Sequence, residues 1–155
     1  MEATTMNPFN LLKSDHEKVA GILSSIDETT ERAAKGRDEL FARLKQELEL
    51  HTKIEEEIFY PALEDSEETR DVTLEAYEEH NLVKQLLAEL EAAPKDTEEW
   101  TAKFTVLKEN IEHHVEEEEG EMFKKARTVL SEDEIEALGD RLQEAKKQNK
   151  AAAAS

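Results

Sequence analysis

The chain has 155 residues, the size of one ordinary domain, and we expect residues 1–150 to form that domain. Its formal net charge of −19 disfavours contact with phosphate backbones and anionic lipids, so no nucleic acid and no membrane is expected as a partner. The absence of cysteine excludes disulfides, thiol chemistry and iron–sulfur clusters.

The composition favours helices. Only four glycines and three prolines occur in a sequence rich in Glu, Lys, Ala and Leu, which argues against sandwiches and barrels with many turns. The N-terminal sequence MEATTMNPF lacks the basic and apolar stretches of a signal peptide. No apolar stretch approaches the roughly 18 residues of a membrane-spanning helix. We therefore expect an all-α protein of the cytoplasm.

The breaks along the chain predict four long helices. Pro8 after Asn7 suits the first position of a helix, and Gly36, Pro61 and Pro94 mark three later breaks. We expect the long helices at about 8–30, 36–60, 66–92 and 97–129.

A shorter helix follows the four long ones. Ser131 with Glu134 resembles a capping box and opens a helix at about 132–148. The low-complexity tail, 151–155, is expected to be disordered. Apolar residues recur at 3-4 spacing in each long helix, and short connections favour antiparallel neighbours. We therefore predict an up-down-up-down antiparallel four-helix bundle with a core at about 8–129 and an additional short C-terminal helix. The apolar seams contain Leu12, Val19, Leu23, Ile26, Leu44, Leu48, Ile58, Ala62, Ala76, Val83, Leu87, Leu90, Trp100, Phe104, Leu107, Ile111 and Met122.

Polar residues occupy the gaps in these apolar seams. A buried, ionised glutamate without a partner costs several kcal/mol, so glutamates among histidines in one core need a common explanation. At about 1.5 Å of rise per residue, all of these side chains reach a similar depth in an up-down bundle. They are His16 in the first helix, His51 and Glu55 in the second, His80 in the third, and His114 and Glu118 in the fourth.

These six residues form an internal repeat. Each half gives one His from its first helix and His-x3-Glu from its second, and the halves are offset by 63 or 64 residues. The i,i+4 spacing puts that His and Glu on one helix face. Two such hairpins make a pseudo-twofold cage for two metal ions. Imidazole and carboxylate without thiolate suit iron, manganese or zinc, and two octahedral ions leave roughly two positions open for water or a small diatomic ligand.

With these motifs the sequence resembles the hemerythrin-like family, also called the HHE cation-binding domain family. The matching pieces are LLKSDHEKV (11–19), HTKIEEEIFYPAL (51–63), EEHNLV (78–83) and HHVEEEEGEMF (113–123). The resemblance implies a four-helix bundle around two iron ions joined by an oxo or hydroxo bridge. It further implies a set of six metal ligands, with the two glutamates as the likely bridges. These ligands are His16, His51, Glu55, His80, His114 and Glu118.

The sequence departs from the oxygen-carrying hemerythrins at one position. Those proteins have a fifth His ligand one turn after the third-helix ligand, where this chain has Lys84. The loss opens a coordination site or calls in another ligand, for which Glu17, Glu56, Glu119 and Tyr77 lie nearby by helical position. A more open centre favours redox chemistry with O2, peroxide or NO, or plain iron binding, over reversible oxygen carriage.

Two other functions compete with such a redox centre. An iron storage or sensing module would couple folding to metal without turnover, because an apo bundle with two buried glutamates is weakened. A non-metal helical scaffold would be unaffected by loss of His51 or His114. Any enzymatic activity is expected to be peroxide- or oxygen-consuming, with no catalytic residue assigned, and oxidative stress is the expected context.

Several neighbours of the cage have two interpretations. Phe59 and Tyr60 either line the ligand pocket or pack at the helix end, and Lys84 either extends outward or donates to a bound oxygen species. We expect Asp15 and Glu79 to lie on a solvated face rather than to accept a ring N–H from a ligand. His113 is expected at the surface or beside the ligand shell, and Tyr77 beside the pocket.

Overall fold

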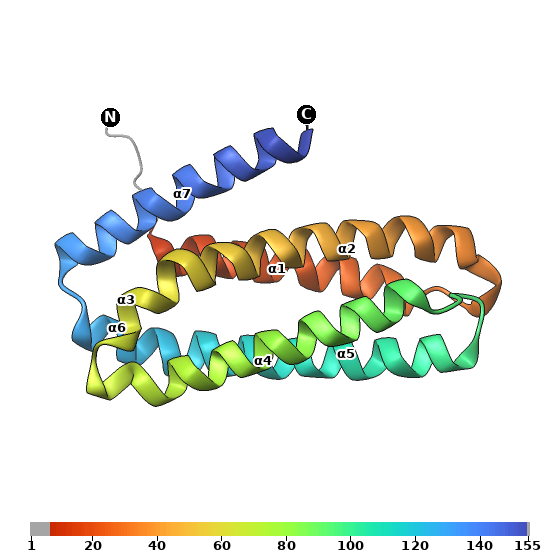
Figure 1. The fold of residues 1–155 in the computed structure, drawn as a ribbon, viewed down its shortest axis with the longest axis horizontal. Helices are drawn as coiled ribbons and strands as arrows, with labels where there is room; N and C mark the ends of the chain where they lie inside the picture. Colours follow the sequence, from red (N-terminus) through yellow and green to blue (C-terminus); the bar gives the residue numbers. More distant parts are fainter. Residues whose placement is uncertain (1–6, 155) are drawn as a thin grey trace.

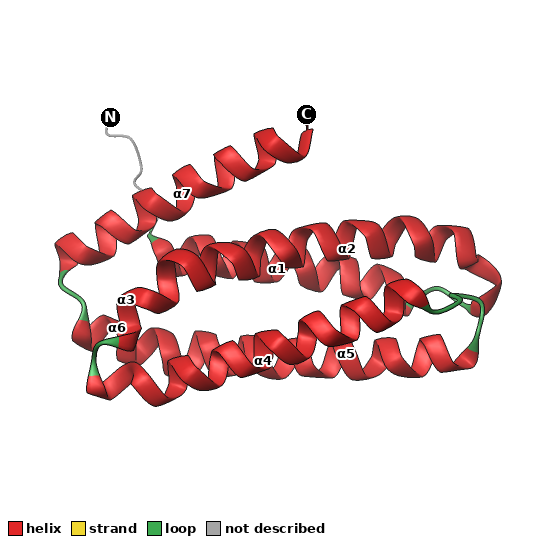
Figure 2. Ribbon diagram, viewed as in Figure 1, coloured by secondary structure: helices red, strands yellow, loops and turns green. Residues whose placement is uncertain are grey.

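The computed structural model describes residues 7–154, and these form two antiparallel helical hairpins and one further helix. The long helices lie side by side in the predicted up-down-up-down order, and the described residues contain no strand (Figure 1, Figure 2). The first hairpin consists of α1 (Pro8–Asp27), a short 3-10 turn, η1 (Glu31–Ala33), and α2 (Ala34–Ile54). The second hairpin consists of α4 (Glu67–Ala92) and α5 (Glu98–Glu117).

Two of the predicted helix starts are confirmed in atomic detail. Asn7 caps α1, since its side-chain oxygen accepts from Phe9 N at 2.8 Å. Ser131 and Glu134 form the reciprocal capping box: Ser131 N donates to Glu134 Oε1 at 2.8 Å, and Glu134 N donates to Ser131 Oγ at 3.1 Å.

The break expected at Gly36 is wrong, because Gly36 lies inside α2 and the chain turns earlier, between α1 and η1. Arg37 explains the difference. Its side chain is buried, donates to Thr29 Oγ1 and to the Lys95 carbonyl oxygen at 2.8 Å each, and lies over the Trp100 ring. These bonds tie the α1–α2 turn to the α4–α5 turn, and they hold the residues around Gly36 in the helix.

The second helix does not end before Pro61. A π-helical turn, η2 (Glu55–Phe59), continues α2 into α3 (Tyr60–Glu64), with Tyr60 N donating to Glu55 O. Proline removes an amide donor, and the wider turn accommodates it within a continuous helix. The extra residue shifts the apolar seam by one position. The predicted seam residues Ile58 and Ala62 are therefore only half-buried, and their neighbours Phe59 and Leu63 are buried instead.

The second hairpin has the same interruption. A second π turn, η3 (Glu118–Met122), follows α5 and leads into α6 (Phe123–Val129). The predicted continuous helix over 97–129 is thus divided at Glu118. Each π turn begins at a glutamate of the repeat, so the pseudo-twofold relation between the hairpins extends to their backbone irregularities.

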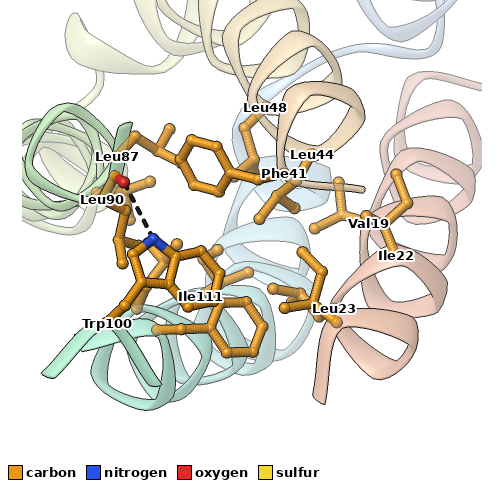
Figure 3. Close-up of a cluster of buried hydrophobic side chains, with 14 residues drawn as sticks. Val19, Ile22, Leu23, Phe41, Leu44, Leu48, Leu87, Leu90, Trp100 and Ile111 are labelled. Carbon is orange, nitrogen blue, oxygen red and sulfur yellow. Dashed lines mark hydrogen bonds between the residues drawn. The ribbon is translucent and has the colours of Figure 1, made fainter. Parts of the chain in front are cut away.

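The apolar core has two parts, and the polar residues of the seams lie between them. One cluster surrounds Trp100, whose Nε1 donates to the Leu90 carbonyl oxygen at 3.0 Å (Figure 3). The other surrounds Phe9, Phe59 and Phe123. In α1, for example, His16 lies between Leu12 of the second cluster and Val19 of the first. The same holds in the other helices: His51 lies between Leu48 and Ile54, His80 between Ala76 and Val83, and His114 between Ile111 and Met122.

The fifth helix, α7 (Glu132–Ala154), folds back over α1 and α2 (Figure 1). Its residues Leu138 and Leu142 are buried in the cluster around Phe9. It is longer than predicted and continues through residues 151–154, for which a disordered tail was expected and where alanine favours helix; Ser155 lies outside the described residues. No helix in the described part of the chain is both long and apolar enough to cross a membrane.

Candidate metal centre

The six polar residues of the seams converge at the middle of the bundle. All are buried, at 0–8% exposure, and each hairpin supplies three of them. Ligand atoms of the first group lie within 4.8 Å of one another, and so do those of the second. The first group contains His16, His51, Glu55 and Glu118, and the second contains Glu55, His80 and His114.

The distances within these groups match the edges of a coordination polyhedron. Donor atoms around an octahedral ion are about 3 Å apart when metal–ligand distances are about 2.1 Å. Glu118 uses both oxygens: Oε1 lies 2.9 Å from His16 Nε2, and Oε2 lies 3.4 Å from His114 Nε2. Glu55 Oε1 lies 3.3 Å from His51 Nε2 and 3.0 Å from His80 Nε2. Each carboxylate therefore spans the two groups.

Four atoms in this cluster are buried without a hydrogen-bond partner. Native proteins rarely leave buried polar atoms unsatisfied, and the binding of an ion is one reason for such atoms. Here they belong to side chains that face one another. His16 Nε2 and Glu118 Oε1 are close enough to form an ion pair, but they do not form a hydrogen bond. The donor set and its orientation therefore fit a metal. The four atoms are His16 Nε2, His51 Nε2, Glu55 Oε2 and Glu118 Oε1.

The electrostatics of the cluster favour charged side chains despite their burial. Burial would raise the pKa of Glu118, but the close, charged contacts with His114 and His16 hold that pKa well below its usual range. Burial likewise opposes charge on His51 and His114, but the facing carboxylates raise their pKa values to about 10 and about 11. In the metal-free protein, the positive charges of these two protonated histidines offset the negative charges of the glutamates.

Each of the four histidines also donates its outer ring N–H to a carboxylate. Such partners fix the tautomer and orientation of a metal-binding imidazole, leaving Nε2 directed inward. The prediction that Asp15 and Glu79 lie on a solvated face is wrong, because Asp15 is 6% exposed and both contact histidines. The pairs are His16 Nδ1–Glu119 Oε2 at 2.6 Å, His51 Nδ1–Asp15 Oδ2 at 2.9 Å, His80 Nδ1–Glu56 Oε2 at 2.7 Å and His114 Nδ1–Glu79 Oε1 at 2.5 Å.

The residues considered as substitutes for the fifth histidine lie elsewhere. Glu56 and Glu119 contact outer ring nitrogens, and Glu17 is exposed. Tyr77 is half-buried, with its hydroxyl 3.5 Å from the Glu56 carbonyl oxygen. Lys84 extends outward and pairs with Glu56 at 2.9 Å. None of the four considered substitutes faces the space between the two groups.

Tyr60 faces that space instead. Its hydroxyl is 2.6 Å from Glu118 Oε2 and 3.1 Å from both Glu55 Oε1 and His80 Nε2. Burial, followed by the nearby Glu118 and Glu55 charges, raises the pKa of Tyr60 well above its usual value, so the phenol is neutral without metal. Sequence reasoning placed Tyr60 only as pocket lining or helix-end packing. A π turn leaves no regular pattern in the sequence, and the equivalent turn at Glu118 has no proline, so periodic spacing alone did not assign Tyr60.

A small cavity adjoins the histidines on the side of the first core cluster. Its volume is about 20 Å³, enough for about one water-sized molecule. Phe59 does not line it, since that ring packs against Phe9 and Phe123. Apart from the four histidines and Thr52, the lining is apolar and consists of Val19, Leu48, Val83, Ile111 and Val115.

The sequence is similar to those of several known proteins. The uncharacterized protein Rv2633c of Mycobacterium tuberculosis is 32% identical over 141 residues, covering 88% of this chain and 83% of that protein. A DNA nickase of Nostoc sp. is 26% identical over 141 residues, covering 91% of this chain but only 39% of that protein.

A solved structure also has a fold similar to that of this chain. The crystal structure of a hemerythrin HHE cation-binding domain-containing protein from Mycobacterium kansasii, a homologue of Rv2633c, superposes with a TM-score of 0.83 at 27% identity, covering 96% of this chain and 90% of that chain. The family model of the hemerythrin HHE cation-binding domain matches residues 7–126, which include all six polar residues. The chain therefore belongs to the hemerythrin HHE cation-binding domain family.

Proposed function

We propose that the chain binds two iron ions and uses them to interact with a small oxidant. In this proposal Glu55 and Glu118 bridge the ions, and the single observation that carries it is the set of buried, unpartnered donor atoms facing one another. The mixed imidazole and carboxylate donors suit a six-coordinate ion of intermediate hardness such as iron. One ion is held by His16 and His51, and the other by His80 and His114.

Tyr60 is proposed to complete the second position. Its phenol oxygen lies within 3.4 Å of a donor atom on each of Glu55, Glu118, His80 and His114, so it occupies the coordination space opened by the absence of a fifth histidine. In the metal-free protein the hydroxyl proton is held between Tyr60 Oη and Glu118 Oε2. Iron, when bound, supplies reversible one-electron chemistry, and the protein supplies fixed donors and a shielded space.

The cavity beside the histidines supports a small ligand. Its volume of about 20 Å³ holds about one water-sized molecule, which supports a ligand as small as O2, NO or peroxide over a larger substrate. The net charge of −19 further supports a small molecule over nucleic acid as the partner. The packing of α7 on the first hairpin supports one domain that includes this helix.

The test is metal content and an ultraviolet–visible spectrum on protein purified without added metal, followed by titration with peroxide and NO. About two irons per chain, an oxo-to-iron absorption band and its change with oxidant would support the proposal. Zinc alone, or no metal after reconstitution with ferrous iron, would overturn it.

An iron storage or sensing role is the second candidate. The observation in its favour is the number of ionisable groups buried without metal, because metal binding then stabilises the fold by mass action. This role predicts a large rise in melting temperature with iron and no consumption of peroxide or O2. Peroxide consumption by the loaded protein would instead support the oxidant proposal.

A further inference from the structure

The fifth helix reaches the candidate metal centre through a chain of three side chains. Lys146 Nζ, on α7, contacts Asp15 Oδ1, and Asp15 Oδ2 accepts from His51 Nδ1 at 2.9 Å. The opposite ring nitrogen, His51 Nε2, faces the cage and lies 3.3 Å from Glu55 Oε1. A residue outside the four-helix core is thereby connected to a candidate ligand, although Lys146 and Asp15 are 131 residues apart in the sequence.

The register of α7 places Lys146 over Asp15. Leu138, Leu142 and Lys146 follow one another at i,i+4 spacing, so they lie on one face of the helix. Both leucines are buried in the cluster that contains Phe9. Apolar docking of α7 therefore delivers the ammonium group to the carboxylate, and the contact is a consequence of how the helix packs.

The environment makes this contact stronger than a surface ion pair. The side chain of Asp15 is 7% exposed and that of Lys146 is 19% exposed. At such burial a charge contact is screened less than in water, and an unpaired carboxylate is costly. Removing the ammonium would leave Asp15 Oδ1 without its cation and free the carboxylate to turn away from His51.

We infer that Lys146 is a positioning residue, which holds Asp15 against His51 and thereby couples the docking of α7 to metal binding at the His16/His51 position. The inference rests on the proposed iron centre. Carboxylate partners of metal-binding histidines typically change metal affinity by about 10–100-fold when lost. By thermodynamic linkage, metal at this position stabilises the docked helix by the same factor.

The other half of the cage supplies an internal comparison. There Lys84 pairs with Glu56 at 2.9 Å, and Glu56 accepts from His80 Nδ1 at 2.7 Å. Lys84 and His80 lie on the same helix, α4, so that lysine cannot separate from the bundle core. Of these two lysines, Lys146 is the one on a helix that packs on the outside of the bundle.

The test compares Lys146→Met with the wild type, with Lys146→Arg, and with Lys147→Met on the neighbouring exposed position. Methionine keeps an apolar stem for packing but removes the charge. Each protein is loaded with ferrous iron without oxygen, and iron is removed by a chelator while its release is followed over time. Hydrogen exchange of α7 amides is measured with and without iron.

In Lys146→Met we expect one of the two irons to be lost roughly 10-fold faster or bound roughly 10-fold more weakly. Lys146→Arg should recover most of this loss, and Lys147→Met should match the wild type. Exchange in α7 should slow on iron loading in the wild type and respond much less in Lys146→Met. Asp15→Asn should weaken the same iron, and adding Lys146→Met to it should have little further effect.

The outcomes separate this inference from the proposed function. If the wild type binds no iron, the proposed function and this inference both fail. If the wild type binds two irons and Lys146→Met releases them identically, with unchanged α7 exchange, only the inference fails. Equal weakening of both irons would also contradict it, since Lys146 is connected to His51 alone.

Discussion

Tyr60 and Phe123 occupy equivalent positions directly after the two π turns, 63 residues apart, and only Tyr60 carries a hydroxyl into the cage. The two metal positions proposed above would therefore be chemically different although the hairpins repeat. At Phe123 the ring packs against Phe9 and Phe59 and closes the core. The asymmetry assigns the added oxygen donor to the side of His80 and His114.

Replacing Tyr60 with Phe is the direct test of this asymmetry. We expect weaker binding of one iron and an altered iron absorption spectrum, because the second position loses an oxygen donor. In the metal-free protein the lost contact with Glu118 should lower the free energy of unfolding by about 1–3 kcal/mol. Iron stoichiometry, spectra and urea denaturation measure these effects. Tyr77→Phe is the matched control and should change none of them, whereas an unchanged spectrum in Tyr60→Phe would exclude the phenol as a donor.

Metal loading at neutral pH should release protons. The pKa values of His51 and His114, raised to about 10 and about 11 by the facing carboxylates, keep both rings protonated in the metal-free protein at pH 7. Metal binding requires neutral imidazole nitrogens, so at least about two protons per chain should leave. Titration with ferrous iron in weakly buffered, oxygen-free solution measures this release. No acidification on binding would contradict the charge state described here.

The metal-free protein should lose stability at alkaline pH. The pKa values of His51 and His114 lie above the unfolded value of about 6.5, so their contribution is fully present below that pH and is lost as pH rises through about 10 and 11. We expect the free energy of unfolding to fall by a few kcal/mol over this range. Urea denaturation with chelator present measures it, and iron loading should suppress the fall.

The same reasoning gives the opposite sign for the carboxylate. The pKa of Glu118 is held below its unfolded value, so its contribution is present above about pH 4.3 and is lost as pH decreases. Stability of the metal-free protein should therefore peak between about pH 5 and 6.5. A stability that increases steadily from pH 7 to 10 would show that the histidines are not charged in the folded state.

Two neighbouring histidines on α5 provide a test variant and its matched control for metal binding. His114 is buried in the cage, whereas His113 is exposed and pairs with Glu117 at 3.1 Å. We expect His114→Ala to lose at least one iron per chain, because it removes a donor that no described side chain replaces. His113→Ala should keep the wild-type content. Metal analysis after reconstitution decides between them, and equal content in both variants would argue against His114 as a ligand.

Filling the cavity should block the small ligand without removing iron. Val115 lines the cavity and is only half-buried, so Val115→Phe can extend into the space with a modest cost of about 1–3 kcal/mol. We expect slower or absent spectral response to NO and peroxide at unchanged iron content. Val106→Phe, at an exposed position of the same helix, serves as the control. A normal response in Val115→Phe would place the ligand elsewhere.

The sequence allowed the bundle and the convergence of the six polar residues to be predicted, because both depend on periodic spacing. His51 and Glu55, for example, are one helical turn apart on a face that is otherwise apolar. Tyr60 was not assigned, because a π turn changes which residues share a face and its hydrogen bonds leave no regular pattern. The contact between Lys146 and Asp15 was also missed, since it depends on how α7 docks. Long-range packing of this kind has no local signature.

The two hairpins exchange donors across their boundary. Glu118, from the second hairpin, reaches His16 of the first, while Glu55, from the first, reaches His80 of the second. Neither half of the chain thus contains the full environment of either ion in the proposed centre. An ion held there would cross-link the two hairpins, so its loss would allow the hairpins to separate from each other. Metal uptake would in turn require that both hairpins are already folded and packed together.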